Sequence, residues 1–308
     1  LPDVDVVPSE HFNTVLYTGN GSTQSITGVG FQPDFLWVKN RSSGSDDHQL
    51  YDAVRTAPKM LKSNDTTAEI NAINGITSFN SDGFTTGSSG GTNNNNSAIV
   101  AWNWKANGSG SSNTDGTITS TVSANVDAGF SISTYTGTGS AATIGHGLSK
   151  APEMFIVKNR EAGGTGSGNW NVFVTVIDGS MDELALNKTD AKADRTLTAP
   201  TTSVISIGTS DERNQSGIDY LAYAFHSVDG YSKVGSYTGN GNADGTFIYT
   251  GFRPAFVICK MVTDAGEGWI MRDNARDPFN VVENHLNANQ SYADSTASQV
   301  YADFLSNG

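Results

Sequence analysis

Short apolar runs separated by polar turns recur along the whole chain. Phe35–Val38 is apolar at every position and follows Pro33 by one residue. A run this short, bounded by a proline and a polar loop, predicts a strand buried on both faces. Ile99–Trp104 alternates instead, with Val100 and Trp102 on one side. Alternation predicts a strand with one face in the core and the other face wetter.

The same series of motifs occurs three times in the same order. Tyr-Thr-Gly-x-Gly stands at 17–21, 135–139 and 237–241. A proline-led apolar strand that ends in Lys follows at 33–39, 152–158 and 254–260. Leu-x-x-Asn then occurs at 61–64, 184–187 and 286–289. Three ordered matches predict three copies of one module.

These matches define the expected organisation of the chain. It comprises an N-terminal extension (1–13), copy one (14–106), a linker and hairpin (107–125), copy two (126–227) and a truncated copy three (228–308). Each copy offers about seven or eight short strands, which is typical of an all-β sandwich or jelly roll. Composition predicts a flexible linker at Asn107–Asn113. The best helix candidate, Val281–Asn287, is short, and we expect a loop with one turn there.

Copy three stops before the segments that would match Phe84 and the closing strand Ile99–Trp104. A sandwich without its last strand leaves an open apolar edge, which folded proteins avoid. We therefore expect the natural chain to continue for about another 20 residues, or a partner to supply the strand. The chain begins with Leu1 rather than Met, which indicates a processed start or an earlier true start.

Composition narrows the class of protein. The 14 Phe, 10 Tyr and 5 Trp provide a core and argue against disorder, despite 34 Gly. A net charge of −13 disfavours nucleic acid as a partner, because phosphate binding needs a basic face. No run reaches the ~18 apolar residues of a membrane span. The single cysteine, Cys259, lies in an apolar run and predicts a buried, inert thiol without a disulfide.

The motifs together resemble an uncharacterised repeat module of phage structural and tail-associated proteins, particularly those of phages of marine bacteria. The resemblance rests on Tyr-Thr-Gly-x-Gly, the strand ending in Lys-Asn-Arg, Leu-x-x-Asn, and Asn214–Gly217 before Tyr220–Tyr223. It covers nearly the whole chain after Phe12. It implies a virion protein with a concanavalin-like or jelly-roll sandwich and implies no site residue.

Asp-x-x-Arg occurs at the equivalent position, or slot, of copies one and three, as Asp52/Arg55 and Asp273/Arg276. Copy two has Val174 and Ile177 in this slot. Such a pair binds a sugar through charge-assisted hydrogen bonds, or it pins a turn as a local ion pair. Pinning a turn is the favoured interpretation.

Two tryptophans, Trp170 and Trp269, follow loops that differ between the copies. They are candidates for stacking on a sugar ring, because variable loops on a fixed scaffold often carry recognition. The favoured alternative makes them core anchors.

Nothing in the sequence predicts catalysis or a resident cofactor. The five histidines share no slot and no metal spacing, and no nucleophile motif is present. Carboxylates cluster at Asp178, Asp182 and Glu183 and at Asp46 and Asp47, but neither cluster recurs in the other copies. Acidic loops suit calcium, yet none matches a calcium-loop motif.

We therefore expect a non-enzymatic virion surface protein, which would be a tail or fibre-like appendage or a capsid decoration. Its expected partners are other virion proteins, further copies of itself and host surface glycans, with no nucleic acid and no membrane. A bacterial secreted adhesin or carbohydrate-binding protein is the alternative. A glycan hydrolase or lyase is a third, less favoured class, and it requires two carboxylates facing each other across a groove.

Overall fold

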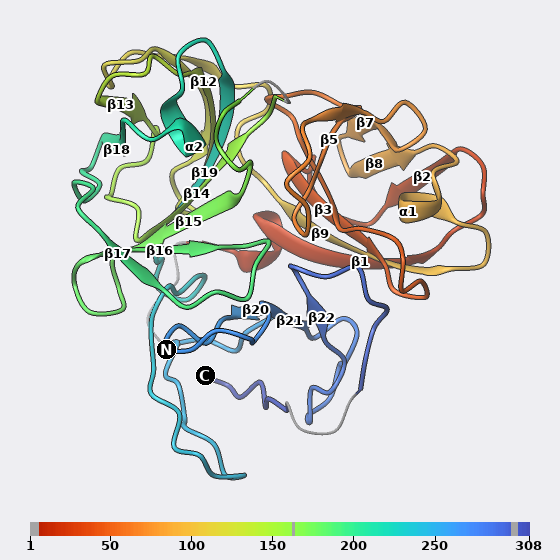
Figure 1. The fold of residues 1–308 in the computed structure, drawn as a ribbon. Coiled ribbons are helices and arrows are strands. Elements are labelled where there is room, and N and C mark those ends of the chain that lie inside the picture. The colour runs from red at the N-terminus through yellow and green to blue at the C-terminus, as the bar shows by residue number, and fades with distance from the viewer. Residues whose placement is uncertain (1–5, 162–163, 297–300) are drawn as a thin grey trace.

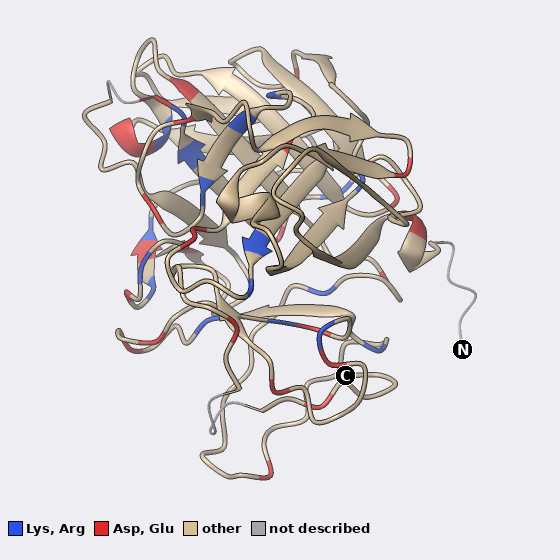
Figure 2. Cartoon of the chain, turned by 90° about the vertical axis from the view of Figure 1, so that its right-hand side faces the viewer, with Lys and Arg blue, Asp and Glu red and all other residues tan. Residues whose placement is uncertain are grey.

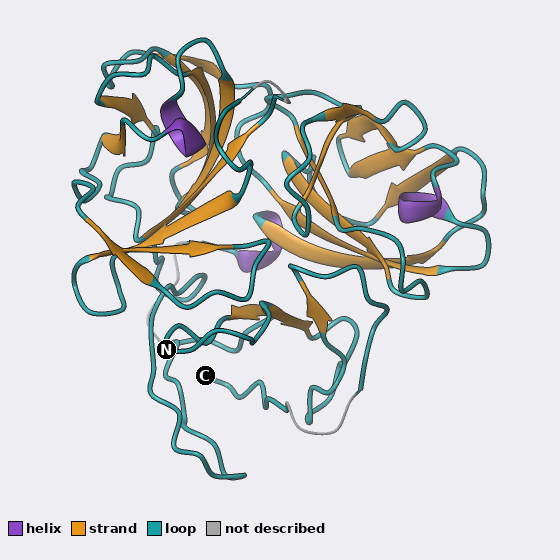
Figure 3. Cartoon of the chain, in the orientation of Figure 1, coloured by secondary structure: helices purple, strands orange, loops and turns teal. Residues whose placement is uncertain are grey.

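The computed structural model describes residues 6–161, 164–296 and 301–308, and these residues form an all-β protein (Figures 1 and 3). The described helical segments are short: the 3-10 turn η1 (Pro8–Glu10), α1 (Gly90–Asn93) and α2 (Asp211–Asn214). No helix among the described residues is long and apolar enough to cross a membrane.

Copy one forms a six-stranded antiparallel sheet and a smaller sheet that packs against it. The large sheet has the order β1-β9-β3-β4-β5-β6, and the small one β2-β8-β7. The strands are β1 (Phe12–Thr18), β2 (Gln24–Thr27), β3 (Phe35–Asn40), β4 (Gln49–Asp52), β5 (Lys59–Lys62), β6 (Ile70–Asn71), β7 (Ile76–Asn80), β8 (Gly83–Thr86) and β9 (Ala98–Trp104).

Copy two repeats this arrangement within a larger sheet. The large sheet has the order β10-β11-β12-β19-β14-β15-β16-β17, and β13 pairs with β18. The strands are β10 (Ser111–Asn113), β11 (Ser120–Asn125), β12 (Phe130–Thr136), β13 (Ala142–Gly145), β14 (Met154–Asn159), β15 (Trp170–Val174), β16 (Met181–Ala185), β17 (Ala193–Arg195), β18 (Val204–Gly208) and β19 (Asp219–Phe225).

The order of equivalent strands is the same in the two copies. The closing strand, β9 or β19, lies between the first strand and the proline-led strand, and the remaining strands follow outward. The short helices α1 and α2 occupy equivalent places, just before the closing strands. The division of the chain into modules, with limits 1–13, 14–106, 107–125, 126–227 and 228–308, stays a prediction.

Copy three forms a smaller sheet, β20-β21-β22, made of β20 (Phe256–Cys259), β21 (Ile270–Asp273) and β22 (Leu286–Asn287). These strands correspond to β3, β4 and β5 of copy one. The described remainder of copy three is largely irregular, as the lower lobe of Figure 3 shows.

The large sheets of all three copies share one hydrophobic core. It contains Trp37 and Trp102 of copy one, Trp170 and Tyr223 of copy two, and Trp269 of copy three. Figure 1 shows the corresponding three lobes meeting at the centre of the view. Copies one and two each have a second core between their own two sheets.

This shared core corrects the expectation for the closing strand. One face of β9 carries Val100 and Trp102 into the shared core, and the other carries Ile99 and Ala101 into the core of copy one. The prediction of a wetter face was wrong, because the sheet packs on both sides.

Three other expectations change. Ser111–Asn113, at the end of the predicted flexible linker, forms β10 and pairs with β11. Val281–Asn287 contains no helical turn, whereas α1 and α2 were not predicted. Cys259 is only partly buried, although burial still raises the pKa of its thiol.

Candidate functional site

The Asp-x-x-Arg pair of copy one lies in the junction between copies one and two. Arg55 Nε donates to Asp52 Oδ2 at 2.5 Å, and both side chains are fully buried. The hydroxyl of Tyr223, from copy two, donates to the same Asp52 oxygen at 2.8 Å. Arg55 also contacts Glu69 at 3.1 Å, and Glu69 in turn accepts from Arg160 of copy two at 2.9 Å. The pair is one part of a polar network that joins the two copies.

The junction between copies three and one repeats this network. Arg276 Nε donates to Asp273 Oδ2 at 2.6 Å, again with both side chains fully buried. Trp102 of copy one donates its indole N–H to Asp273 at 3.0 Å. Asp294 bridges Arg276, at 2.8 Å, and Arg41 of copy one, at 2.7 Å. Trp102 therefore takes the place of Tyr223, and Arg41 that of Arg160.

The junction between copies two and three lacks this polar network. Val174 and Ile177 stand in the Asp and Arg slots, and Val262 stands in the slot of Arg160 and Arg41. One backbone contact is kept in all three junctions: Glu69 N to Arg160 O, Lys192 N to Val262 O, and Asp294 N to Arg41 O, at 2.8 to 2.9 Å. The copies thus follow one another cyclically, and two of the three junctions carry a buried Asp–Arg pair.

The tryptophans occupy these junctions as well. Trp170 donates its indole N–H to Lys62 O of copy one at 2.7 Å, and Trp269 donates to Ala185 O of copy two at 2.9 Å. His48 has the same slot in copy one and accepts from the indole N–H of Trp37 at 2.8 Å.

The asparagines of the Leu-x-x-Asn motifs hold the backbone of this slot in every copy. Asn64, Asn187 and Asn289 accept from the amides of His48, Trp170 and Trp269 at 3.0, 2.9 and 2.8 Å. This shared contact explains why the motif recurs three times.

The lysines that end the proline-led strands of copies two and three also reach a neighbouring copy, whereas Lys39 donates to Asn40 O and Ser43 O of its own copy. Lys158 Nζ donates to Thr66 O of copy one, and Lys260 Nζ donates to Thr189 O of copy two, both at 3.3 Å. Burial lowers the pKa of Lys158 to about 8, and it lowers that of Lys39 to about 8 as well. These ammonium groups are held among backbone carbonyls rather than displayed to solvent.

The candidate ligand-binding residues are therefore all used inside the molecule. Trp170, Asp52 and Asp273 have no exposed surface, and the other three are at most 7% exposed: Trp269, Arg55 and Arg276. A buried side chain presents no surface to a glycan, so we assign all six to the junctions. Sequence reasoning missed their partners Glu69, Arg160, Asp294 and Arg41. The Lys-Asn-Arg ending of the proline-led strand could have pointed to Arg41 and Arg160, because copies one and two carry it and copy three lacks it.

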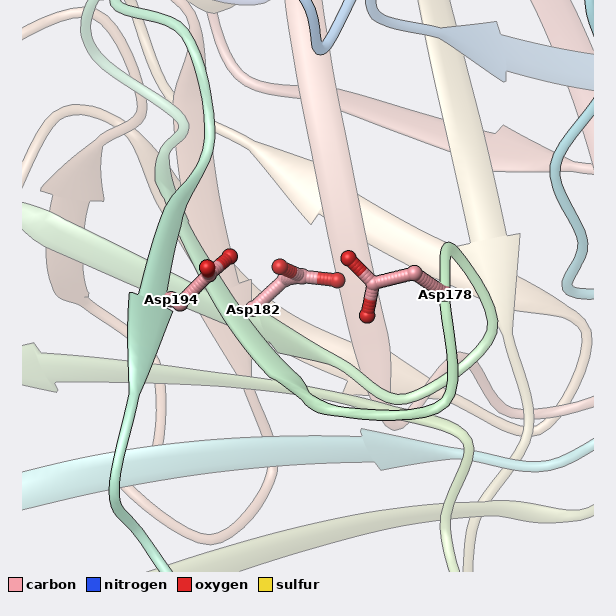
Figure 4. Close-up of side chains that lie close together, drawn as sticks. All are labelled: Asp178, Asp182 and Asp194. Carbon is pink, nitrogen blue, oxygen red and sulfur yellow. The ribbon is translucent and has the colours of Figure 1, made fainter.

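The one group of three carboxylates that could hold a metal ion, among the described residues, surrounds a lysine. Asp178, Asp182 and Asp194 lie with carboxylate oxygens within 4.8 Å of one another and turned toward one another (Figure 4). Lys192 Nζ donates to all three at 2.6 to 2.7 Å. This contact lowers the pKa of Asp178, whereas burial raises that of Asp182. The ammonium group occupies the position that a cation would take.

The other acidic residues singled out in the sequence are also paired. Asp47 contacts Lys62 at 2.7 Å, and Glu183 contacts Arg195 at 2.6 Å. Asp46 accepts from the side-chain amide of Asn40 at 2.7 Å. None of these contacts forms the two-carboxylate groove of a glycosidase.

Two depressions in the described part of the surface are lined mainly by polar residues and adjoin each other. One, of about 400 Å³, lies over the junction of copies one and two and is lined by Lys59, Ala68, Glu69, Arg160, Glu161 and Asp219. The second, of about 260 Å³, shares Arg160 and Asp219 and is otherwise lined by Tyr135, Ser112, Ser120, Thr119, Thr121, Thr134 and Thr136.

Comparisons with known proteins give a family but no function. A family model described as a domain of unknown function, DUF7483, matches residues 7–308. Searches of the curated proteins and of the solved structures found no match.

Proposed function

The chain belongs to the DUF7483 family, and from this premise we propose that it is a non-enzymatic structural protein of a virion surface. In this role it forms part of a tail, a fibre-like appendage or a capsid decoration, and it assembles with other virion proteins and further copies of itself.

The observation that carries the proposal is where the reactive side chains lie. The Asp–Arg pairs, Trp170, Trp269 and the buried lysines all connect one copy to the next. When these groups form contacts between copies, they hold the copies in a rigid scaffold that carries variable loops at its surface. Such a scaffold suits display and assembly.

The net charge of the chain also favours proteins over nucleic acid as partners. In Figure 2 the basic positions are scattered among acidic ones along the chain, and the net charge is −13. This negative charge disfavours nucleic acid as a partner and favours solubility at high local concentration.

The test is to locate the protein in intact virions by cryo-electron microscopy. We expect a three-lobed density at regularly repeated positions on the tail or capsid. Recovery of the protein from a bacterial envelope, with none in purified virions, would overturn the proposal in favour of a secreted adhesin.

A carbohydrate-binding role is the second candidate, and the depression lined by Ser and Thr residues favours it. Residues of this kind, with Arg160 and Asp219, carry donors and acceptors that can hold sugar hydroxyls. A glycan array with the wild type and Asp219→Ala tests it. Binding that the substitution abolishes supports host-glycan contact, and turnover of any bound glycan would point to a hydrolase or lyase instead.

A further inference from the structure

A hydroxyl, a carboxylate and a carboxamide meet at the surface of copy two. Hydrogen bonds join the segment just before β15 to α2 and to the residue that follows it. Thr165 Oγ1 donates to Asp211 Oδ2 at 2.5 Å, and the same hydroxyl oxygen lies 3.1 Å from Gln215 Oε1. The backbone N–H of Thr165 also donates to Gln215 Oε1, at 2.6 Å. A nucleophile, a base and a polarised carbonyl group therefore share one site.

Close packing of two backbones holds this arrangement. A Cβ at Gly166 would lie 2.8 Å from Asp211 O, nearer than real Cβ atoms come, so a glycine is required there. The buried hydroxyl of Tyr220 donates to Asp211 O at 2.7 Å and accepts from Gln215 N at 2.9 Å. One hydroxyl thus contacts both ends of the segment that carries the carboxylate and the carboxamide.

Copy one shows that the fold does not require these groups. Its short helix α1 occupies the place of α2, and Gly90 and Asn94 stand in the slots of Asp211 and Gln215. The side chain of Asn94 donates to Ser97 Oγ instead. Because the same helical turn forms without the carboxylate and the glutamine, their placement in copy two is not explained by helix formation.

A second hydroxyl in the same segment provides an internal comparison. Ser167 Oγ and Ser167 N donate to Glu212 Oε1 at 2.5 and 2.7 Å. The Ser167 oxygen accepts from the side-chain amide nitrogen of Asn169, whereas the Thr165 oxygen lies beside a carbonyl oxygen. Ser167 and Glu212 therefore pair a hydroxyl with a carboxylate without a carbonyl group held for attack.

We propose that copy two modifies itself by forming an ester between the side chains of Thr165 and Gln215, with loss of ammonia. Asp211 takes the hydroxyl proton as the Thr165 oxygen attacks Cδ of Gln215. The backbone N–H of Thr165 stabilises the negative charge that develops on Oε1. The Cδ–Nε2 bond then breaks, Asp211 returns the proton to the departing nitrogen, and one molecule of ammonia leaves. The step needs no oxidant, reductant or cofactor.

The position of the three groups favours this step. A nucleophile held beside its target reacts as if at an effective concentration of about 10⁵ M or more. Thr165 and Asp211 are exposed, so ammonia escapes into solvent and the reverse step lacks a reactant. The ester joins residues 50 positions apart and constrains the unfolded chain in the way that a disulfide does. The inference is independent of the proposed virion role, since it concerns a bond within the chain.

Mass spectrometry of the folded full chain tests the proposal. We expect a species that is lighter than the mass of the sequence by one ammonia and that accumulates during incubation at neutral pH. A tryptic digest should then contain peptide 161–188 linked to peptide 214–233, since each lies between basic residues. Neutral hydroxylamine, which cleaves esters, should separate the two peptides.

Three variants assign the chemistry. Thr165→Val is expected to abolish the linked peptide, and Asp211→Asn to slow its formation by about 100-fold or more. Ser167→Ala is the matched control and should leave the linked fraction unchanged, with circular dichroism as the check on folding. A wild type that loses no ammonia would overturn the proposal. So would a loss that persists in Thr165→Val, which would place it elsewhere, such as at an Asn-Gly pair, or glutamate at position 215 without a linked peptide.

Discussion

The hydroxyl of Tyr223 donates a 2.8 Å hydrogen bond to Asp52, which lies 171 residues earlier in the chain. The acceptor oxygen is the one that Arg55 also contacts, so a single carboxylate holds both a turn and a neighbouring copy. Trp102 stands in the same relation to Asp273. At both junctions that carry a buried Asp–Arg pair, the closing strand of the neighbouring copy therefore supplies a hydrogen-bond donor to the carboxylate.

Asp52→Ala is expected to destabilise the protein strongly. The substitution leaves the buried Arg55 guanidinium with Glu69 as its carboxylate partner and removes the acceptor of Tyr223. Loss of one partner of a buried pair typically costs about 3–5 kcal/mol. Urea unfolding followed by tryptophan fluorescence measures the change.

Asp190→Ala is the matched control for Asp52→Ala. Its side chain is 64% exposed and lies 3.9 Å from Lys188. We expect a change within about 0.5 kcal/mol, as for other surface substitutions. A loss below about 1 kcal/mol for Asp52→Ala would show that the junction relaxes and admits water.

Tyr223→Phe isolates the hydrogen bond between copies one and two. The ring stays in the shared core, and only the hydroxyl is lost. A buried hydrogen bond to a charged group contributes about 1.5–3 kcal/mol, so we expect a loss in that range. Tyr249→Phe, at a residue that is 67% exposed, is expected to change stability little. Equal effects of the two substitutions would mean that the hydroxyl of Tyr223 contributes nothing.

The sequence predicted the strands well because their signals are local. Phe35–Val38 was expected to be buried on both faces, and β3 is buried throughout. The alternating pattern of Ile99–Trp104 was misread, because period alone shows that two faces differ and not what covers each of them. The third copy of the sheet, which covers one face, is far away in the chain.

The candidate residues show the same limit. Asp52 and Arg55 were recognised as a pair, and the favoured prediction of a local ion pair agrees with their 2.5 Å contact. Their partner Tyr223 belongs to another copy, and no spacing in the sequence connects the two. Packing between repeats depends on how the sheets stack, which the pattern within one repeat does not specify.

His48 makes stability sensitive to acid. Burial lowers the pKa of its imidazole well below 6.5, and the positive charges of Lys39 and Arg276 lower it further. The unfolded state then binds a proton below about pH 6.5 that the folded state does not, so stability falls as pH decreases, by about 1.4 kcal/mol per pH unit. Protonation of Nδ1 would also break the bond from Trp37.

His48→Gln keeps an acceptor for Trp37 and removes the titration. Urea unfolding between pH 7 and about pH 5 should give a shallower slope for this variant than for the wild type. His285→Gln, at a histidine that is only partly buried, is expected to change the slope less. Parallel curves for the wild type and His48→Gln would rule out a contribution from His48.

Lys192→Met is expected to convert the carboxylate cluster into a calcium-dependent site. Without the ammonium group, Asp178, Asp182 and Asp194 bring three carboxylates within 4.8 Å of one another with no counter-charge. Their mutual repulsion destabilises the folded state, and calcium, which prefers oxygen ligands, relieves it by binding only the folded form.

Thermal unfolding in chelator and in millimolar calcium tests this conversion. The variant should melt lower than the wild type in chelator and recover with calcium, whereas the wild type should not respond, because the ammonium group of Lys192 already contacts all three carboxylates. Lys188→Met removes a neighbouring, more exposed lysine and should leave both curves unchanged. An equal calcium response in the wild type would show that the ion displaces Lys192 and that the lysine does not keep calcium out of the cluster.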